Sequence, residues 1–277
     1  MRTPPTQVLE PVPVAIGGAR GGPDQRTLRQ DRWWVAPVIT VTILTAFVAY
    51  ATYAAIVNKD FYVGASAHRD LISPFYSPCL TQSCKDVGYP TPIGVISWWT
   101  ISPAILILIV PLGFRLTCYY YRRAYYRSFW LSPPGCAVAD AHGSYSGETR
   151  FPLILQNIHR YFFYLGLLFN IILTIDAVEA FRQPGIGIGV SVGTIVLCVN
   201  AVCLWLYSLS CHACRHLCGG GTRMFSTSPL RYRLWKLVTP LNARHMQFAW
   251  LSLVVVALTD LYVRLVASGA FHDPRLF

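Results

Sequence analysis

Charged residues are scarce in this 277-residue sequence. They make up 13% of it, whereas ordinary globular chains carry about 25%. So little charge excludes an ordinary soluble surface. The composition also excludes a secreted disulfide scaffold, a disordered acidic chain and a nucleic-acid binder whose basic residues cover a polar face. Hydrophobic residues make up 54% and the mean hydropathy is +0.43, which predicts a protein that crosses a membrane several times.

Other familiar patterns are also missing. The sequence has no internal repeat and no Walker, Rossmann or catalytic-triad pattern. No small-residue cleavage site follows the first apolar stretch, which starts too deep and runs too long for a signal peptide. We therefore expect that stretch to remain in the protein as its first span.

Five apolar stretches are long enough to cross a hydrocarbon core of about 30 Å, which takes about 20 helical residues. They cover residues 34–57, 92–118, 161–181, 186–210 and 248–267. In lipid every backbone polar group must be paired within its own segment, so the spans must be helices. The predicted fold is all-α, a bundle of five transmembrane helices over residues 34–270, with kinks at Pro103 and Pro111. Residues 1–33, with five prolines in the first 25, are expected to form a flexible cytoplasmic arm, and 271–277 an outer tail.

The basic residues predict the orientation, because Lys and Arg accumulate in short cytoplasmic segments. With the N-terminus in the cytoplasm, 17 of the 23 basic residues fall in inner segments. We therefore expect the N-terminus to be cytoplasmic and the C-terminus to lie outside, in the inner membrane of a bacterial cell.

The cysteines fall into three groups. Cys79 and Cys84 lie in the outer loop between the first two predicted spans, where a disulfide can persist, and we expect them to be bonded. Cysteine is often buried as a small hydrophobic residue, so plain packing is expected for four scattered ones: Cys118, Cys136, Cys198 and Cys203.

The third group is dense. Eight residues at the cytoplasmic end of the fourth span hold three cysteines and two histidines: Cys211, His212, Cys214, His216 and Cys218. The cytoplasm keeps thiols reduced, and thiolate with imidazole is typical of a metal site. Two Cys and two His satisfy either a tetrahedral zinc ion or a Rieske-type [2Fe–2S] cluster.

Helix geometry limits how these five residues can act together. At about 100° per residue, the three cysteines share one face of a regular helix and the two histidines share another. Either the segment unwinds near Cys211, as Gly219–Gly221 would permit, or one ligand pair comes from elsewhere. His159 and His245, both at the inner ends of spans, are the reserve ligands.

At this motif the chain resembles the membrane-anchor subunit of actinobacterial, mycobacterial-type succinate dehydrogenase, the respiratory complex II that carries a membrane-embedded Rieske-type cluster. The segment Cys211–Gly220 after the fourth of five spans carries the resemblance. The resemblance implies flavoprotein and iron–sulfur partner subunits on the cytoplasmic face. It also implies electron transfer through the cluster to a membrane quinone, with menaquinone expected, and no activity for the chain alone. The basic inner loops offer a docking surface for such a partner.

Ionisable residues inside a membrane are costly and are candidates for function. A group in the outer third of the predicted bundle is therefore a candidate quinone site: Trp98, Trp99, Asp176, Asp260 and Arg264. The competing explanation is that these residues hold neighbouring helices together. An inner alternative comprises Arg115, Tyr119 and Arg160.

Two other functions stay open on the sequence alone. A b-type cytochrome anchor could hold one haem at the inner side. Two stacked haems are disfavoured, because no histidine lies in the outer half of a predicted span. From a different class, the chain could be a membrane scaffold or a transporter with a structural zinc at Cys211–Cys218. Transport is disfavoured because no pair of broken helices recurs in two halves of the sequence.

Overall fold

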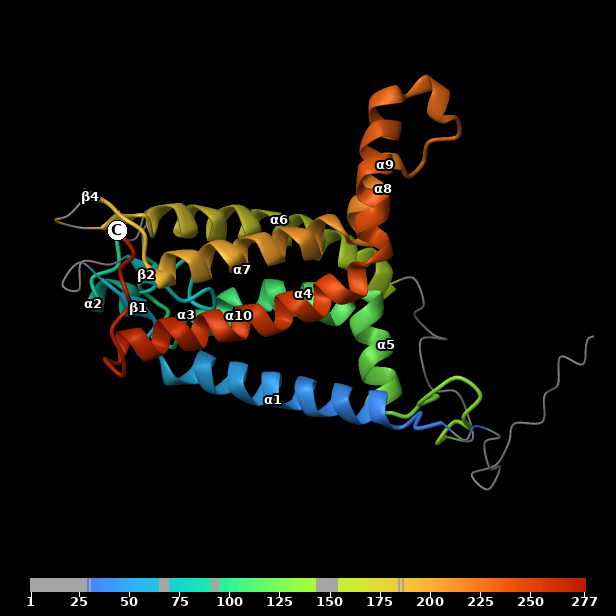
Figure 1. Cartoon of the computed structure of the whole chain (residues 1–277), viewed down its shortest axis with the longest axis horizontal. Coiled ribbons are helices and arrows are strands. Elements are labelled where there is room, and N and C mark those ends of the chain that lie inside the picture. The colour runs from blue at the N-terminus through green and yellow to red at the C-terminus, as the bar shows by residue number, and fades with distance from the viewer. Residues whose placement is uncertain are drawn as a thin grey trace, which may run out of the picture.

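A computed structural model describes residues 29, 31–64, 70–90, 95–142, 154–183, 185 and 187–277. The expected N-terminal arm, residues 1–33, lies outside these residues apart from Arg29 and Asp31–Trp33. The fold is all-α, with a few two-residue strands at one end (Figure 1).

Four helices in the described residues are long and apolar enough to cross a membrane: α1 (Val35–Val57), α6 (Ile154–Glu179), α7 (Val192–Leu209) and α10 (His245–Ala267). The bent pair Pro103–Thr117 and Tyr119–Ser128 passes the same test as a fifth candidate crossing. The start of α1 and the C-terminus lie at opposite ends of the bundle (Figure 1), as an odd number of crossings requires. The chain is therefore a polytopic membrane protein, as its composition predicts.

The second span differs from the prediction in where it begins and bends. It consists of α3 (Pro103–Ile107) and α4 (Ile109–Thr117), and residues 95–102 before it are not helical. Pro103 begins the helix instead of kinking it, because the first helical position needs no N–H donor. Pro111 cannot donate to the Ile107 carbonyl, and the break between α3 and α4 falls at Leu108, one turn before it.

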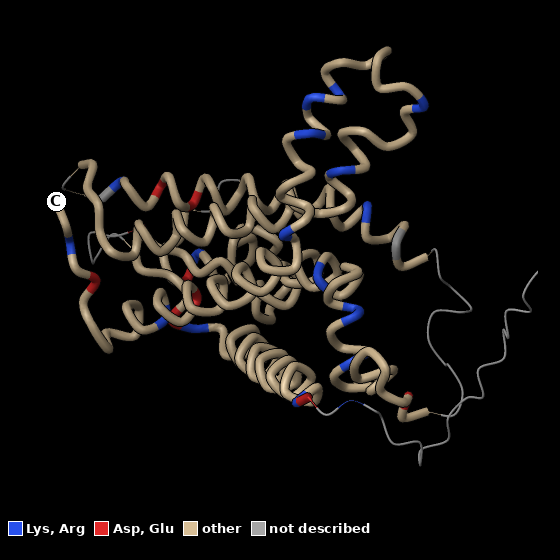
Figure 2. Tube along the Cα trace, turned by 45° about the vertical axis from the view of Figure 1, so that its right-hand side comes forward, with Lys and Arg blue, Asp and Glu red and all other residues tan. Residues whose placement is uncertain are grey.

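Three helices turn away from the spans at the inner end. α5 (Tyr119–Ser128) follows α4 at an angle of 75°. α8 (His212–Gly219) and α9 (Pro229–Ala243), joined through the short helix η2 (Phe225–Thr227), form a hairpin that projects across the span direction (Figure 1). Lys and Arg concentrate at this end of the molecule (Figure 2), which the positive-inside rule assigns to the cytoplasmic face.

The opposite end carries short paired segments. β1 (Tyr62–Val63) pairs with β2 (Leu71–Ile72), and β3 (Arg182–Gln183) pairs with β4 (Gly187–Ile188), both antiparallel. Cys79 and Cys84 are joined by a disulfide, and Cys84 lies in α2 (Gln82–Asp86). The outer loop between α1 and α3 is thus tied to itself.

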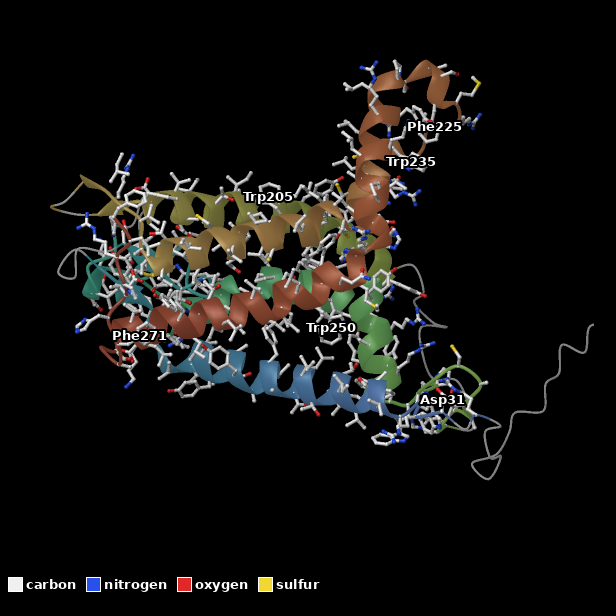
Figure 3. The ribbon with its side chains drawn as sticks, in the orientation of Figure 1. Asp31, Trp205, Phe225, Trp235, Trp250 and Phe271 are labelled. Carbon is white, nitrogen blue, oxygen red and sulfur yellow. A yellow bond between two sulfur atoms is a disulfide. The ribbon has the colours of Figure 1, made fainter. Side chains whose placement is uncertain are left out.

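Close helix packing brings the inner ends of α4 and α6 together. Gly113 of α4 lies directly against Phe162 of α6, where an added Cβ would overlap the ring. Between α6 and α7, Trp205 of α7, which Figure 3 labels, donates to the Thr174 hydroxyl of α6 at 2.9 Å. Small residues and interhelical hydrogen bonds of this kind drive association in lipid, where the hydrophobic effect does not act between helices.

Candidate functional site

A cavity of about 390 Å³ opens where the inner ends of α4, α6, α7 and α10 meet the crosswise helices α5 and α8. Its lining contains two thiols, four imidazoles and two guanidinium groups, contributed by Cys118, Cys211, His159, His212, His216, His245, Arg122 and Arg160. We call it the inner cavity. Five of these residues are buried: Cys118, Cys211, Arg122, His159 and His245.

His159 of α6 is held from three directions. Its Nδ1 lies 2.9 Å from the Thr117 hydroxyl and its Nε2 lies 3.1 Å from the Cys211 sulfur. The imidazole is stacked on the Phe114 ring, with the centroids 4.9 Å apart. Its orientation is therefore fixed, and one nitrogen faces a thiol.

His245, the first residue of α10, repeats the arrangement. Its Nδ1 lies 2.7 Å from the Ser210 hydroxyl and its Nε2 lies 3.4 Å from the Cys118 sulfur. The ring is stacked on Tyr207, with centroids 5.3 Å apart and planes 7° from parallel. The inner cavity thus contains two matched pairs, each with one imidazole against one thiol and a hydroxyl on the other ring nitrogen.

The two thiols occupy equivalent positions in the chain. Cys118 separates α4 from α5 and is the N-cap of α5, and Cys211 follows α7 and is the N-cap of α8. The positive end of a helix dipole favours an anion such as a thiolate. The Cys211 sulfur accepts a hydrogen bond from the Ala213 N–H at 3.4 Å, while burial raises the pKa of its thiol.

The remaining motif residues separate from this group. α8 starts only after Cys211, so the helix is interrupted there, as one of the two geometric alternatives requires. Cys214 and Cys218 lie outside the inner cavity lining, and burial raises the pKa of Cys214 to about 11. His212 and His216 reach the lining from exposed positions. Within the described residues, no three His, Cys, Asp or Glu side chains are grouped so that they could hold a metal ion.

Sequence reasoning assigned Cys118 to plain packing and so missed its place beside His245. Cys118 and His245 are 127 residues apart, and no local motif marks the cysteine. The sequence did contain one indication. Cys118 ends the second predicted span and Cys211 follows the fourth, so both cysteines are expected at the same level of the membrane.

A second cavity, of about 370 Å³, lies deeper in the bundle between α1, α3, α4, α6 and α7. Its lining is almost entirely apolar and includes the polar side chains of Arg115, Asn170 and Ser208. Phe114 and Tyr207 also line it. These two rings stack on His159 and His245, so they lie between the apolar cavity and the two histidines of the inner cavity.

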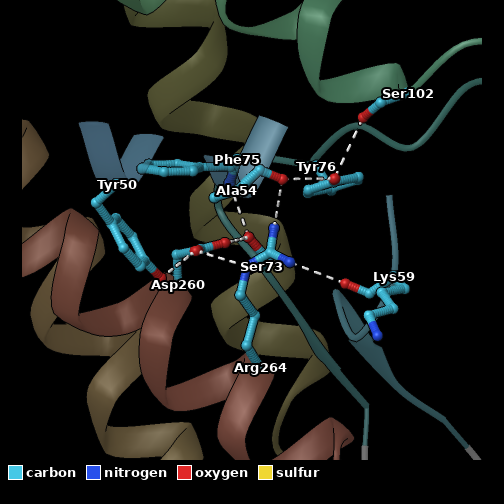
Figure 4. Close-up of polar contacts among 9 residues, drawn as sticks. All are labelled: Tyr50, Ala54, Lys59, Ser73, Phe75, Tyr76, Ser102, Asp260 and Arg264. Carbon is cyan, nitrogen blue, oxygen red and sulfur yellow. Dashed lines mark hydrogen bonds and ion pairs between the residues drawn. The ribbon is translucent and has the colours of Figure 1, made fainter. Parts of the chain in front are cut away.

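The predicted outer quinone residues have a different setting. Asp260 accepts hydrogen bonds from the hydroxyls of Tyr50 and Ser73 and forms an ion pair with Arg264 at 2.8 Å (Figure 4). The Arg264 guanidinium also donates to the Ala54 and Lys59 carbonyls at the C-terminal end of α1. Both charges are thus satisfied within the protein, and they join α10, α1 and the outer loop.

Asp176 accepts a hydrogen bond from Ser77 of the same loop. Trp99 donates to the Ser102 carbonyl at 3.1 Å, and Trp98 is 75% exposed. None of the five outer residues lines either of the two cavities. Of the inner alternatives, Arg115 lines the apolar cavity, whereas Tyr119 and Arg160 line the inner cavity.

Comparison with known proteins gives one family and one solved structure. The family model described as actinobacterial succinate dehydrogenase subunit SdhC matches residues 35–269. The solved structure is the Mycobacterium smegmatis Sdh1 complex in the apo form. A chain of it is 47% identical, with a TM-score of 0.84 over 95% of this chain and 98% of that one. No curated protein matches the sequence.

Proposed function

We propose a route for electrons through this chain. The chain belongs to the actinobacterial succinate dehydrogenase SdhC family. The chain is a multi-pass subunit of the bacterial inner membrane and part of an enzyme complex, in which it associates with the other succinate dehydrogenase subunits. In the proposed function, it takes electrons from a docked iron–sulfur subunit and passes them to a membrane quinone. The inner cavity holds a [2Fe–2S] cluster, and the apolar cavity binds the quinone.

The observation that carries the metal proposal is the matched pairing of two thiols with two oriented imidazoles in one buried cavity. A Rieske-type cluster takes two Cys and two His, and its histidines normally have their second nitrogen held by a further group. We assign the cluster to Cys118, Cys211, His159 and His245. Among the described residues these side chains form two separate Cys–His contacts and not a group of three around one point, so a two-iron cluster would have to bridge the two pairs. Thr117 and Ser210 orient the two imidazoles. The assignment keeps Cys211 from the motif, takes both reserve histidines and adds Cys118.

When bound, such a cluster would supply a one-electron carrier with a potential above that of an all-cysteine cluster. The protein's own residues perform the other tasks. Thr117 and Ser210 fix the imidazole rings, and the starts of α5 and α8 favour thiolate at both cysteines. All four side chains are buried.

The quinone assignment rests on the two shared aromatic rings. Phe114 and Tyr207 contact the histidines on one side and line the apolar cavity on the other. A quinone headgroup beside these rings could accept hydrogen bonds from Arg115 or Ser208, and its isoprenoid tail could leave toward lipid between α1 and α4. The outer residues Asp260, Arg264 and Asp176 are then assigned to helix and loop attachment.

Low-temperature EPR of the reduced, purified complex tests the cluster, together with iron and acid-labile sulfide analysis. We expect a histidine-ligated [2Fe–2S] spectrum, which His159→Ala and His245→Ala each abolish and which His212→Ala and His216→Ala retain. If the variants behave in the reverse way, the ligands lie in the 211–218 motif. One zinc per complex, without additional iron or sulfide, would refute the proposed function.

A further inference from the structure

The hairpin formed by α8, η2 and α9 has an unusual charge balance. Residues 212–243 contain five basic side chains and no Asp or Glu: Arg215, Arg223, Arg231, Arg233 and Lys236. Two of these cations rest on aromatic rings of the hairpin itself, Arg215 over Trp235 at 4.7 Å and Lys236 over Tyr232 at 5.5 Å. The hairpin therefore presents positive charge with no acidic partner of its own.

α9 also carries an exposed apolar stripe. Leu230, Leu234 and Leu237 are four and three residues apart and so share one helix face. They are 68%, 42% and 69% exposed. Arg231 and Arg233 flank the stripe on its two sides, at about 100° per residue. A leucine face bordered by cations is typical of a helix that lies in a membrane interface.

The direction of the stripe follows from the packing of η2. Phe225 contacts Tyr232 and Trp235 of α9, with centroids 5.2 and 5.3 Å apart. The loop that holds η2 lies on the side of α9 turned away from the spans, where Figure 3 also labels Phe225 and Trp235. Tyr232 is two residues from both Leu230 and Leu234, which is about 200° around the helix. The leucines therefore face back toward the level of the spans, where lipid lies.

We propose that the α8–α9 hairpin is an in-plane membrane anchor. The stripe Leu230, Leu234 and Leu237 inserts among acyl chains of the inner leaflet, and Arg233, which borders the stripe, binds the phosphate headgroups of anionic phospholipids. Soluble partner subunits approach from the opposite side of the hairpin. The anchor extends the footprint of the chain in the inner leaflet beyond its five spans, independently of what the cavities bind.

Photo-crosslinking in the assembled complex tests the position of the stripe. p-Benzoylphenylalanine placed at Leu237 in native membranes should form adducts with phospholipid. The same group at Tyr232, on the opposite face, should form at least about tenfold fewer. Adducts of the Leu237 variant with the iron–sulfur or flavoprotein subunit would overturn the proposal and make the stripe a protein-docking surface. Absence of any lipid adduct at Leu237 would overturn it as well.

Lipid titration by native mass spectrometry tests the charges. Phosphatidylglycerol is added to the delipidated complex, and Arg233→Gln should weaken its binding by about fivefold at this site. Lys85→Gln removes the same charge at the outer end and should leave that binding unchanged. Equal loss in both variants, or no loss in Arg233→Gln, would contradict the anchor. If Arg233→Gln fails to assemble, the crosslink at Leu237 in the otherwise native chain still decides.

Discussion

The Nε2 of His159 lies 3.1 Å from the sulfur of Cys211, although 52 residues separate them in the chain. The pair joins the inner end of α6 to the break between α7 and α8. Cys118 and His245 form the matching contact across the same cavity. Two chain interruptions and two helix ends thus meet at one depth in the membrane.

Replacing single cysteines distinguishes the ligands proposed in the inner cavity from those expected in the 211–218 motif. Cys118→Ala should abolish the [2Fe–2S] EPR signal and remove about two irons and two sulfides per complex, because it takes away one thiolate of the proposed site. Cys214→Ala should retain both, since its thiol lies outside the inner cavity. The measurement is EPR with iron and sulfide analysis of purified complexes. Retention of the cluster in Cys118→Ala would eliminate this cysteine as a ligand.

Filling the apolar cavity should impair quinone reduction and leave the cluster intact. Ala51 of α1 lines that cavity, and Ala46 of the same helix lines a separate cavity between α1 and α10. Ala51→Phe is expected to lower kcat/KM for a quinone analogue by about tenfold or more, through lost binding space. Electron transfer from succinate to a water-soluble acceptor should not change. Ala46→Phe is the matched control, and an equal effect from it would argue against a quinone in this cavity.

The ion pair between Asp260 and Arg264 should support stability and contribute nothing to turnover. Asp260→Asn leaves the Arg264 guanidinium buried without its carboxylate, which costs about 3–5 kcal/mol when a buried pair is broken. We expect a lower melting temperature for the complex and an unchanged KM for quinone. A raised quinone KM at unchanged stability would instead return Asp260 to the quinone site.

The contact between Gly113 and Phe162 predicts a graded packing effect. Gly113→Ala should destabilise the complex, because a Cβ would overlap the Phe162 ring and separate α4 from α6. Gly166→Ala places its Cβ 3.3 Å from Phe114, a milder conflict. Thermal unfolding should therefore show a larger loss for Gly113→Ala. The opposite order would show that the two helices can separate at Gly113 with little effect.

Removing the Cys79–Cys84 disulfide should weaken the outer loop alone. The double variant Cys79→Ser with Cys84→Ser is expected to lose about 2 kcal/mol of stability, as closure of a short loop implies. The EPR signal of the inner cavity should remain, because that site lies at the other end of the bundle. Its loss would reveal coupling between the two ends.

The sequence by itself determined that the chain lies in a membrane, how many times it crosses and which end is cytoplasmic. Apolarity forces helices in lipid, and the excess of Arg and Lys fixes the cytoplasmic side. These properties are sums over long segments, so they do not depend on any single contact. The Cys211–Cys218 motif also marked the inner end of the fourth span as a candidate metal site.

Only the tertiary structure decided which residues meet there. Cys118, His159 and His245 come from helices far apart in the chain, and helix packing brings them to Cys211. Cys214 and Cys218 are neighbours of Cys211 in sequence, yet α8 begins after Cys211 and carries them out of the cavity lining. Asp260 is a second example. The sequence implies that its charge is costly in lipid, and the tertiary structure shows that Arg264, Tyr50 and Ser73 offset that cost. Composition fixes the cost of burying each group, whereas the fold alone determines which partner offsets it.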